Sequence, residues 1–295
     1  MKIWYFSCIH LDIMSVFSKR FLVGSLEDLS RPEPIKPRVH TLVFDPGIDA
    51  DVCVVAGDFF PDLIRSVEAL EPISKRMPVI LVPGNRDYYR GPFRPDTKTK
   101  LLSVAKRRAK KIGNIHVLEN GSVVIDGTTF IGSTLWTDLR GVTDPAVFEP
   151  WNDFRKIFVK PDQRFTPAHQ TRAFLRSKAY IDAELKKPKT GPRVVVSHTI
   201  PHPAGVSPRF ADNAFGVFFN NDFSNLLASA DAPEAWIFGN NLDGCDVQVG
   251  RTRLLSNPHG HVLKNGQAEN PNFNVNKTFE LGAIAQTPEQ QGMLG

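Results

Sequence analysis

The feature that most constrains the fold of this chain is a series of short apolar segments, many of which end in glycine or in a polar side chain. Their length and their β-branched residues are typical of strands that are buried on both faces of a sheet. Segments with a helical spacing of apolar residues alternate with them, which predicts an α/β protein with helices covering its sheets. The predicted strands are 3–7, 51–58, 78–85, 115–120, 122–134, 193–199 and 235–241 with a hairpin at 246–256, and the predicted helices are 61–76, 97–112, 166–187 and 222–230.

Side chains that can bind ligands follow several of these strands. In open α/β sheets the functional site lies beyond the carboxyl ends of the strands. Several such ends in one chain therefore predict a single site at that edge, although each end taken alone is weak support. The strand ends in question are Ser7-Cys8-Ile9-His10, Gly57-Asp58, Gly84-Asn85, Ser197-His198 and Gly239-Asn240.

Composition narrows the class of protein. A chain of 295 residues with 41% hydrophobic and 23% charged residues is not largely disordered, and it has no apolar run long enough to span a membrane. Three cysteines make no disulfide framework, and the N-terminus does not resemble a signal peptide, so we expect a cytoplasmic protein. We expect one domain over 1–281, with a proline-rich surface excursion at 18–50, and a peripheral tail over 282–295.

The order of the strand-end motifs resembles that of the calcineurin-like metallophosphoesterases, whose pattern is D-x-H, G-D, G-N-H-[DE], H and G-H-x-H. The resemblance covers most of the chain and extends to the segments 130–139, 151–157 and 256–276. It implies a four-layer α/β sandwich, in which two mixed β-sheets are flanked by helices. It also implies a site where two divalent metals share a carboxylate and hold a phosphate for in-line displacement.

The resemblance places a reduced set of metal ligands in this chain. Asp58, Asn85 and His198 keep the family form, His10 is also kept, and Asn240 stands where the family has histidine. An amide oxygen is a weaker ligand than imidazole, so we expect either no metal or one weakly bound Mn, Fe or Zn ion. Without the motif order, Asp58 and Asn85 would be read as helix caps and His198 as a satisfied polar group.

Other family positions are changed. Leu242 has no ligand atom, and Cys8, in place of a carboxylate, is a small buried hydrophobe or, as the alternative, a thiolate with a metal or redox role. Arg86 stands where the family has an acid–base histidine, and its permanent charge repels a metal and favours a phosphate. Arg86 and Asp87 are the candidate catalytic residues, and Arg86 is also the candidate anion-binding residue.

Two functions follow from these changes. The first is a pseudoenzyme, a metallophosphoesterase scaffold that serves as an anion-binding or structural subunit for a phosphate-containing ligand or a protein partner. The second is an active hydrolase of phosphate monoesters or diesters with an atypical mononuclear site. We favour the first, because several changes together remove metal ligands and the general acid.

Three further features of the sequence have a structural and a functional interpretation. His259 and His261 have the spacing of a metal pair, but we favour a surface or rim role for them. Cys245 is taken as structural. The segment Lys98–Lys111 carries seven basic residues and no acid, and its apolar residues have a helical spacing. We expect an amphipathic helix covering the sheet, with a nucleic-acid contact as the functional alternative.

Overall fold

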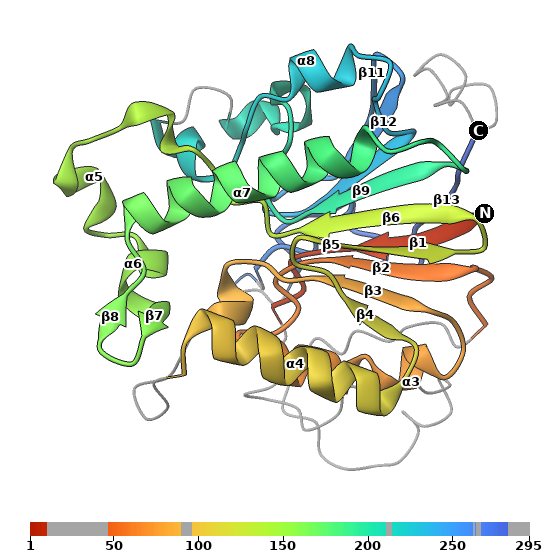
Figure 1. Ribbon diagram of the computed structural model, residues 1–295, viewed down its shortest axis with the longest axis horizontal. Helices are drawn as coiled ribbons and strands as arrows, with labels where there is room; N and C mark the ends of the chain where they lie inside the picture. Colours follow the sequence, from red (N-terminus) through yellow and green to blue (C-terminus); the bar gives the residue numbers. More distant parts are fainter. Residues whose placement is uncertain (11–46, 90–95, 211–213, 262, 264–266, 283–295) are drawn as a thin grey trace.

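Two β-sheets pack face to face in the computed structural model, and helices cover their outer faces (Figure 1). The structure describes residues 1–10, 47–89, 96–210, 214–261, 263 and 267–282. This arrangement confirms the predicted four-layer α/β sandwich of two mixed sheets. The predicted excursion at 18–50 lies almost wholly outside the described residues, and so does the predicted tail from residue 283 onwards, so the domain boundary stays a prediction.

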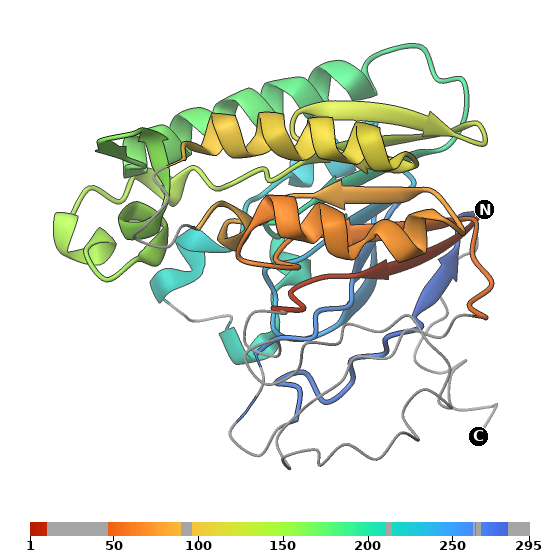
Figure 2. The same ribbon diagram turned by 90° about the horizontal axis from the view of Figure 1, so that it is seen from below.

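The first sheet has the strand order β13-β1-β2-β3-β4. Its central strands are parallel, and only β13 at the edge, which was not predicted, pairs antiparallel with β1. The helices α2 and α4 lie side by side on its outer face (Figure 2). The elements are β1 (Lys2–Phe6), β2 (Val52–Ala56), β3 (Val79–Val82), β4 (Ile115–Val117), β13 (Thr278–Glu280), α2 (Leu63–Ala69), α3 (Glu71–Ser74) and α4 (Lys98–Ile112).

The second sheet has the strand order β11-β12-β10-β9-β6-β5. Its four inner strands are parallel, and an antiparallel strand closes each edge. The long helix α7 runs over its outer face (Figure 1). The elements are β5 (Gly121–Ile125), β6 (Thr128–Ser133), β9 (Arg193–Ser197), β10 (Ala235–Phe238), β11 (Cys245–Val249), β12 (Thr252–Ser256), α7 (Pro167–Leu185) and α8 (Ser224–Leu227).

Alternate residues of the strands build two separate cores. In β1, Ile3 and Tyr5 belong to one buried cluster, whereas Trp4 and Phe6 belong to the other. The first cluster joins the two sheets, because it also contains Val194 and other inward residues of the second sheet. The second contains residues of the covering helices. A strand buried on both faces needs apolar side chains on both, which explains why the sequence shows near-continuous apolar runs.

Two predicted elements are divided in the structure. The segment 122–134 forms β5 and β6, because Asp126 and Gly127, with φ of 45° and 77°, make the left-handed turn of a two-residue hairpin. The predicted helix 61–76 is α2 followed by α3, which has a proline at its start. Smaller elements lie beyond the prediction, namely α5 (Pro145–Phe148), α6 (Asn152–Lys156), β7 (Phe158–Lys160) and β8 (Gln163–Arg164).

The basic helix α4 is amphipathic, as predicted. It buries Leu101, Ala105 and Ala109 against the first sheet, and its other face carries exposed lysines and arginines. Lys98, at its first turn, forms an ion pair of 3.0 Å with the buried Glu119. The nucleic-acid contact stays a prediction. Across the described ranges, the structure contains no helix with the length and apolarity that crossing a bilayer requires.

The end of β3 approaches the end of β2 so closely that Gly84 has no room for a side chain. A Cβ atom at this position would meet the Asp58 carboxylate and would lie 2.6 Å from the Asp58 backbone nitrogen. We expect Gly84→Ala to lower the free energy of unfolding by about 1–3 kcal/mol, because backbone atoms must move to admit the methyl group. Chemical denaturation measures this loss.

Gly121→Ala is the matched control for this substitution. The nearest atom to a Cβ at Gly121 lies at 3.7 Å, which is an ordinary van der Waals contact. We expect its free energy of unfolding to stay within about 0.5 kcal/mol of the wild type. Equal losses in the two variants would show that the close approach at Gly84 is not the cause.

Candidate functional site

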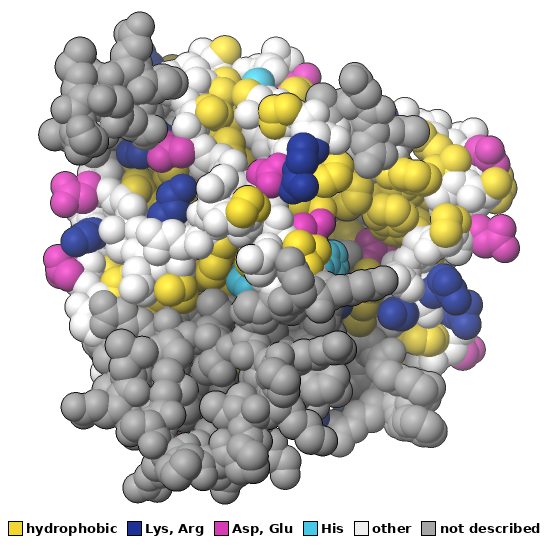
Figure 3. Space-filling view, turned by 180° about the vertical axis from the view of Figure 1, so that it is seen from behind, with side chains coloured by type: hydrophobic (Ala, Val, Ile, Leu, Met, Phe, Trp, Pro, Cys, Tyr) yellow, Lys and Arg dark blue, Asp and Glu magenta, His cyan; other side chains and the backbone are white. Residues whose placement is uncertain are grey.

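The strand ends that the sequence singled out meet at one edge of the two sheets. Four of their residues, Cys8, His10, Asp58 and Asn240, have positive φ between 51° and 55°, a left-handed conformation that is uncommon for side chains other than glycine. These conformations turn the chain sharply at the strand ends. Figure 3 shows a hollow on the face opposite to that of Figure 1, with histidine side chains beside it and apolar side chains gathered along one side.

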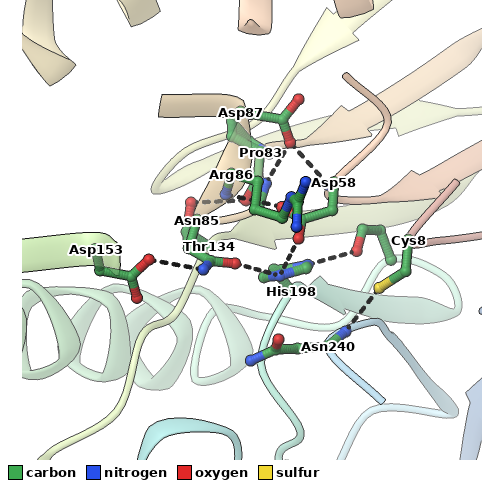
Figure 4. A network of polar contacts seen from close by, with 12 residues as sticks. Cys8, Asp58, Pro83, Asn85, Arg86, Asp87, Thr134, Asp153, His198 and Asn240 are labelled. Carbon is green, nitrogen blue, oxygen red and sulfur yellow. Dashed lines mark hydrogen bonds and ion pairs between the residues drawn. The ribbon is translucent and has the colours of Figure 1, made fainter. Parts of the chain in front are cut away.

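The buried carboxylate of Asp87 ties the ends of β2 and β3 together (Figure 4). Its Oδ2 accepts hydrogen bonds from the backbone N–H groups of Asp58, at 2.8 Å, and Gly84, at 2.7 Å. Its Oδ1 accepts a bond of 2.7 Å from the hydroxyl of Ser66 on α2. Burial and the nearby charge of Asp58 raise the pKa of Asp87 to about 7. The contacts of Asp87 therefore position the site, and the catalytic role predicted for it stays a prediction.

Three acceptor atoms face one another beside Asp87. His198 Nε2 lies 3.0 Å from Asn85 Oδ1 and 3.6 Å from Asp58 Oδ2. The other ring nitrogen, Nδ1, lies 3.0 Å from the carbonyl of Ala56, which accepts only, so Nδ1 carries the proton. Burial lowers the pKa of His198, so the ring is neutral at pH 7 and Nε2 presents a lone pair. Nε2 therefore lies close to two oxygens, and a bound cation would relieve the repulsion between these acceptor atoms.

Asp153 completes this network from a segment to which the sequence assigned no site role. Its Oδ1 accepts hydrogen bonds from Asn85 Nδ2, at 2.8 Å, and from the hydroxyl of Tyr89, at 2.6 Å. Trp151 Nε1 donates to Oδ2 at 3.2 Å. These contacts fix the amide of Asn85 so that its oxygen points at His198. The resemblance of the segment 151–157 to the family is the sequence signal that points to Asp153.

Cys8 and Leu242, at two positions where the family has metal ligands, offer neither a carboxylate nor an imidazole. Cys8 is buried, and burial followed by the charge of Asp58 raises its thiol pKa to about 12, so it stays protonated. Its sulfur accepts the backbone N–H of Asn240 at 3.2 Å. Leu242 lines a small apolar pocket instead of the polar site. The structure therefore places Cys8 and Asn240 at the site and turns Leu242 to another environment.

Arg86 and His10 lie next to a histidine that the sequence placed at the rim. The ring of His261 stacks on that of His10 with centroids 4.8 Å apart, and its Nε2 lies 3.4 Å from Arg86 Nη1. Glu269 contacts His261 Nδ1 at 2.9 Å. Burial, and then the charge of Arg86, lower the pKa of His10 well below its usual value, so His10 is neutral.

His259 lies in a different environment from His261. Its Nδ1 lies 2.9 Å from the carbonyl of Gly260, and its ring packs against Phe273. Only 4% of His259 is exposed, so it is a buried residue, unlike the surface or rim role that we expected. His261, with 46% of its side chain exposed, does lie at the rim.

The residues present do not fit a two-metal centre. Cys8 is a neutral thiol, Leu242 has no ligand atom, and the described part of the chain contains no group of three histidine, cysteine or acidic residues that could hold a metal. What remains is a set of three donors, Asp58, Asn85 and His198, one of which is an amide. This set fits one cation at most.

Three comparisons with known proteins bear on the fold. Residues 1–243 match the family model of calcineurin-like phosphoesterases. The chain is 24% identical over 254 residues to an uncharacterized protein, L509, of Acanthamoeba polyphaga mimivirus, which covers 80% of this chain and 82% of that protein. The crystal structure of a phosphopantetheinyl hydrolase from Mycobacterium tuberculosis superposes with a TM-score of 0.58 at 14% identity and covers 88% of this chain and 89% of that one. At this identity the likeness shows the shared fold.

The hydrogen bonds of Asp87 predict the effect of replacing it. In Asp87→Asn, one carboxylate oxygen becomes an NH₂ group, so either the hydrogen bond from Ser66 or those from the two backbone N–H groups cannot form, and the charged acceptor is lost. We expect the free energy of unfolding to fall by about 1–3 kcal/mol, measured by urea denaturation at pH 7.5. Asp126→Asn, in the exposed turn between β5 and β6, is the matched control and should change it by less than about 0.5 kcal/mol. Equal stability of Asp87→Asn and wild type would contradict the positioning role.

The described thiols should not react in the folded protein. Cys8, Cys53 and Cys245 are buried, and burial raises the pKa of each above its usual value. At pH 8, a thiol with the pKa of about 12 that Cys8 has is thiolate in about one molecule in ten thousand. We expect iodoacetamide to leave all three unmodified at pH 8 and to alkylate all three in 8 M urea, as read by peptide mass spectrometry. Rapid alkylation of folded Cys8 would restore the thiolate alternative.

Proposed function

This chain belongs to the calcineurin-like phosphoesterase family, as the order of its motifs predicted, and on that basis we propose that it binds a phosphate-containing ligand without performing two-metal hydrolysis. The observation that carries the proposal is the place of Arg86. Its guanidinium lies beside His10 and His261 at the strand-end site, where the family pattern has a neutral histidine.

The chemistry of Arg86 favours an anion. A guanidinium stays protonated at every physiological pH and offers a planar set of donors that matches two oxygens of a phosphate. The backbone N–H of Arg86 donates to Asp58 Oδ1 at 2.9 Å, which fixes the residue at the end of β3. His10 is neutral, so its ring can donate or accept a hydrogen bond without adding charge.

Side chains at the other family positions support binding over hydrolysis. The neutral thiol of Cys8 and the hydrocarbon of Leu242 replace two metal ligands, and Arg86 cannot release a proton at neutral pH. The acid–base histidine and two metal-ligand side chains of the family pattern are therefore replaced in this chain. Each normally contributes orders of magnitude in rate. A pseudoenzyme that retains a phosphate-binding pocket accounts for all of these residues.

One observation favours a second candidate, a hydrolase with a single metal. Asp58 Oδ2, Asn85 Oδ1 and His198 Nε2 converge, and they would hold one divalent cation. Such an ion supplies Lewis-acid polarisation of a phosphoryl oxygen when it is bound. In this candidate Arg86 would stabilise the negative charge that develops on the phosphate.

Phosphate binding tests the proposal directly. We expect inorganic phosphate to bind the wild type in calorimetric titration, and Arg86→Leu to weaken its affinity by about 10- to 100-fold, because a charged hydrogen-bond donor is lost. Arg107→Leu, on the exposed face of α4, is the matched control and should leave the affinity unchanged. Equal affinity in the Arg86→Leu variant and the wild type would refute the proposed site.

Turnover separates the two candidates. We expect bis(4-nitrophenyl) phosphate with added Mn²⁺ to be hydrolysed by the wild type no faster than by His198→Ala. Elemental analysis of the purified protein is the companion measurement. Stoichiometric metal, together with turnover that His198→Ala abolishes, would establish the single-metal hydrolase and overturn the pseudoenzyme.

A further inference from the structure

A small apolar pocket lies next to the site, where the family pattern would place a metal-binding histidine. Its apolar lining comes from Ile200, Val206, Phe210, Phe219 and Leu242, and its volume is about 80 Å³. These residues follow β9 and β10 in the chain, so the pocket lies at the same edge of the second sheet as His198. Leu242 stands at a family ligand position, but in this structure its side chain lines the apolar pocket.

Asn240 joins the pocket to the polar site. It lines the pocket, while its backbone N–H donates to the sulfur of Cys8 (Figure 4). In Figure 4 the side chain of Asn240 lies below His198 and points away from Cys8. Asn240 is therefore the residue that the polar site and the pocket share.

The walls of the pocket are held in place by polar contacts behind them. Arg209 and Asp243, the neighbours of Phe210 and Leu242 in the chain, form two hydrogen bonds of 2.8 Å and 2.6 Å. The Asn241 amide donates to the carbonyl of Gly205 at 2.9 Å. An exposed ion pair adds little to the free energy of unfolding, but the Arg209–Asp243 pair links the segments that carry Phe210 and Leu242. The pocket is thus formed before any ligand arrives.

Apolar surface continues from the pocket along a second side of the site. Phe219 contacts the ring of Trp151 at 5.5 Å, and Trp151 stacks on Phe218 at 4.0 Å. Trp151 also donates to Asp153, which holds Asn85. Figure 3 shows apolar side chains gathered along one side of the hollow on this face. Polar groups for an anion and apolar walls for its substituent are therefore adjacent.

We infer that the ligand is a monoester of phosphate with a short branched aliphatic group, the phosphate at Arg86 and the aliphatic group in the pocket. This inference rests on the proposed function and adds the class of ligand. A volume of about 80 Å³ is roughly half that of an engineered apolar cavity of about 150 Å³ that binds benzene. An isopropyl group, with half the carbon atoms of benzene, matches this size.

The test compares two phosphate monoesters that differ only in the aliphatic group. We expect isobutyl phosphate to bind the wild type at least tenfold more tightly than methyl phosphate, in a titration followed by calorimetry. The physical reason is that each buried methylene adds about 0.8 kcal/mol, or roughly fourfold. Leu242→Gln should reduce the ratio of the two affinities to below about threefold, because the wall becomes polar.

Two further variants keep the test decisive if Leu242→Gln folds poorly. Val206→Ile narrows the pocket and should also lower the ratio. Leu175→Gln changes an exposed leucine on α7 and should leave the ratio at its wild-type value. A circular dichroism melt of each variant checks that it is folded.

The outcomes distinguish this inference from the proposal beneath it. Equal affinity of the wild type for the two esters would overturn the aliphatic pocket, while phosphate binding that depends on Arg86 would leave the proposed function intact. Failure of both esters and of inorganic phosphate to bind would refute the proposed function, and this inference with it. An unchanged ratio in Leu242→Gln and Val206→Ile would also overturn the inference.

Discussion

The carboxylate of Asp87 is the contact on which the site depends. It accepts two backbone N–H groups and one hydroxyl, and these donors come from the ends of β2 and β3 and from α2. Asp58, Asn85 and Arg86 all lie on the two loops that it joins. Burial raises the pKa of this carboxyl, and the three donors oppose that effect by stabilising the charged form. The side chains around it are therefore fixed by a buried group that belongs to no ligand set.

On that rigid frame, a few side chains change the chemistry without changing the fold. Cys8 is a neutral thiol whose sulfur accepts a hydrogen bond from a backbone N–H. Leu242 lines an apolar pocket. Arg86 brings a fixed positive charge to a place that the family pattern leaves neutral. Asp58, Asn85 and His198 keep a set of converging acceptors. The same strand ends thus place three potential metal donors close to a fixed positive charge, and Leu242 lines an apolar pocket.

Much of the framework could be predicted because burial on both faces of a strand leaves a direct trace in the sequence. Apolar runs such as 51–58 and 193–199 became central parallel strands for that reason. The Asp126-Gly127 pair has the sequence signature of a two-residue hairpin turn, and this turn divides the segment 122–134 into β5 and β6. The edge strand β13 is short and mostly polar, because a strand at the edge of a sheet buries less side-chain surface. Its sequence therefore shows no apolar pattern that predicts a strand.

The sequence by itself determined the kinds of side chain at the strand ends and the order of the motifs. Strands and turns depend on the types of residue at neighbouring positions, so they can be predicted locally. Only the tertiary structure decided which of these side chains touch. Asn85 meets Asp153 from 68 residues away, and Arg86 meets His261 from 175 residues away. Such contacts depend on how two sheets pack and on where the loops beyond them return. The environment of Leu242 was decided in the same way, since an apolar wall exists only when several loops close around it.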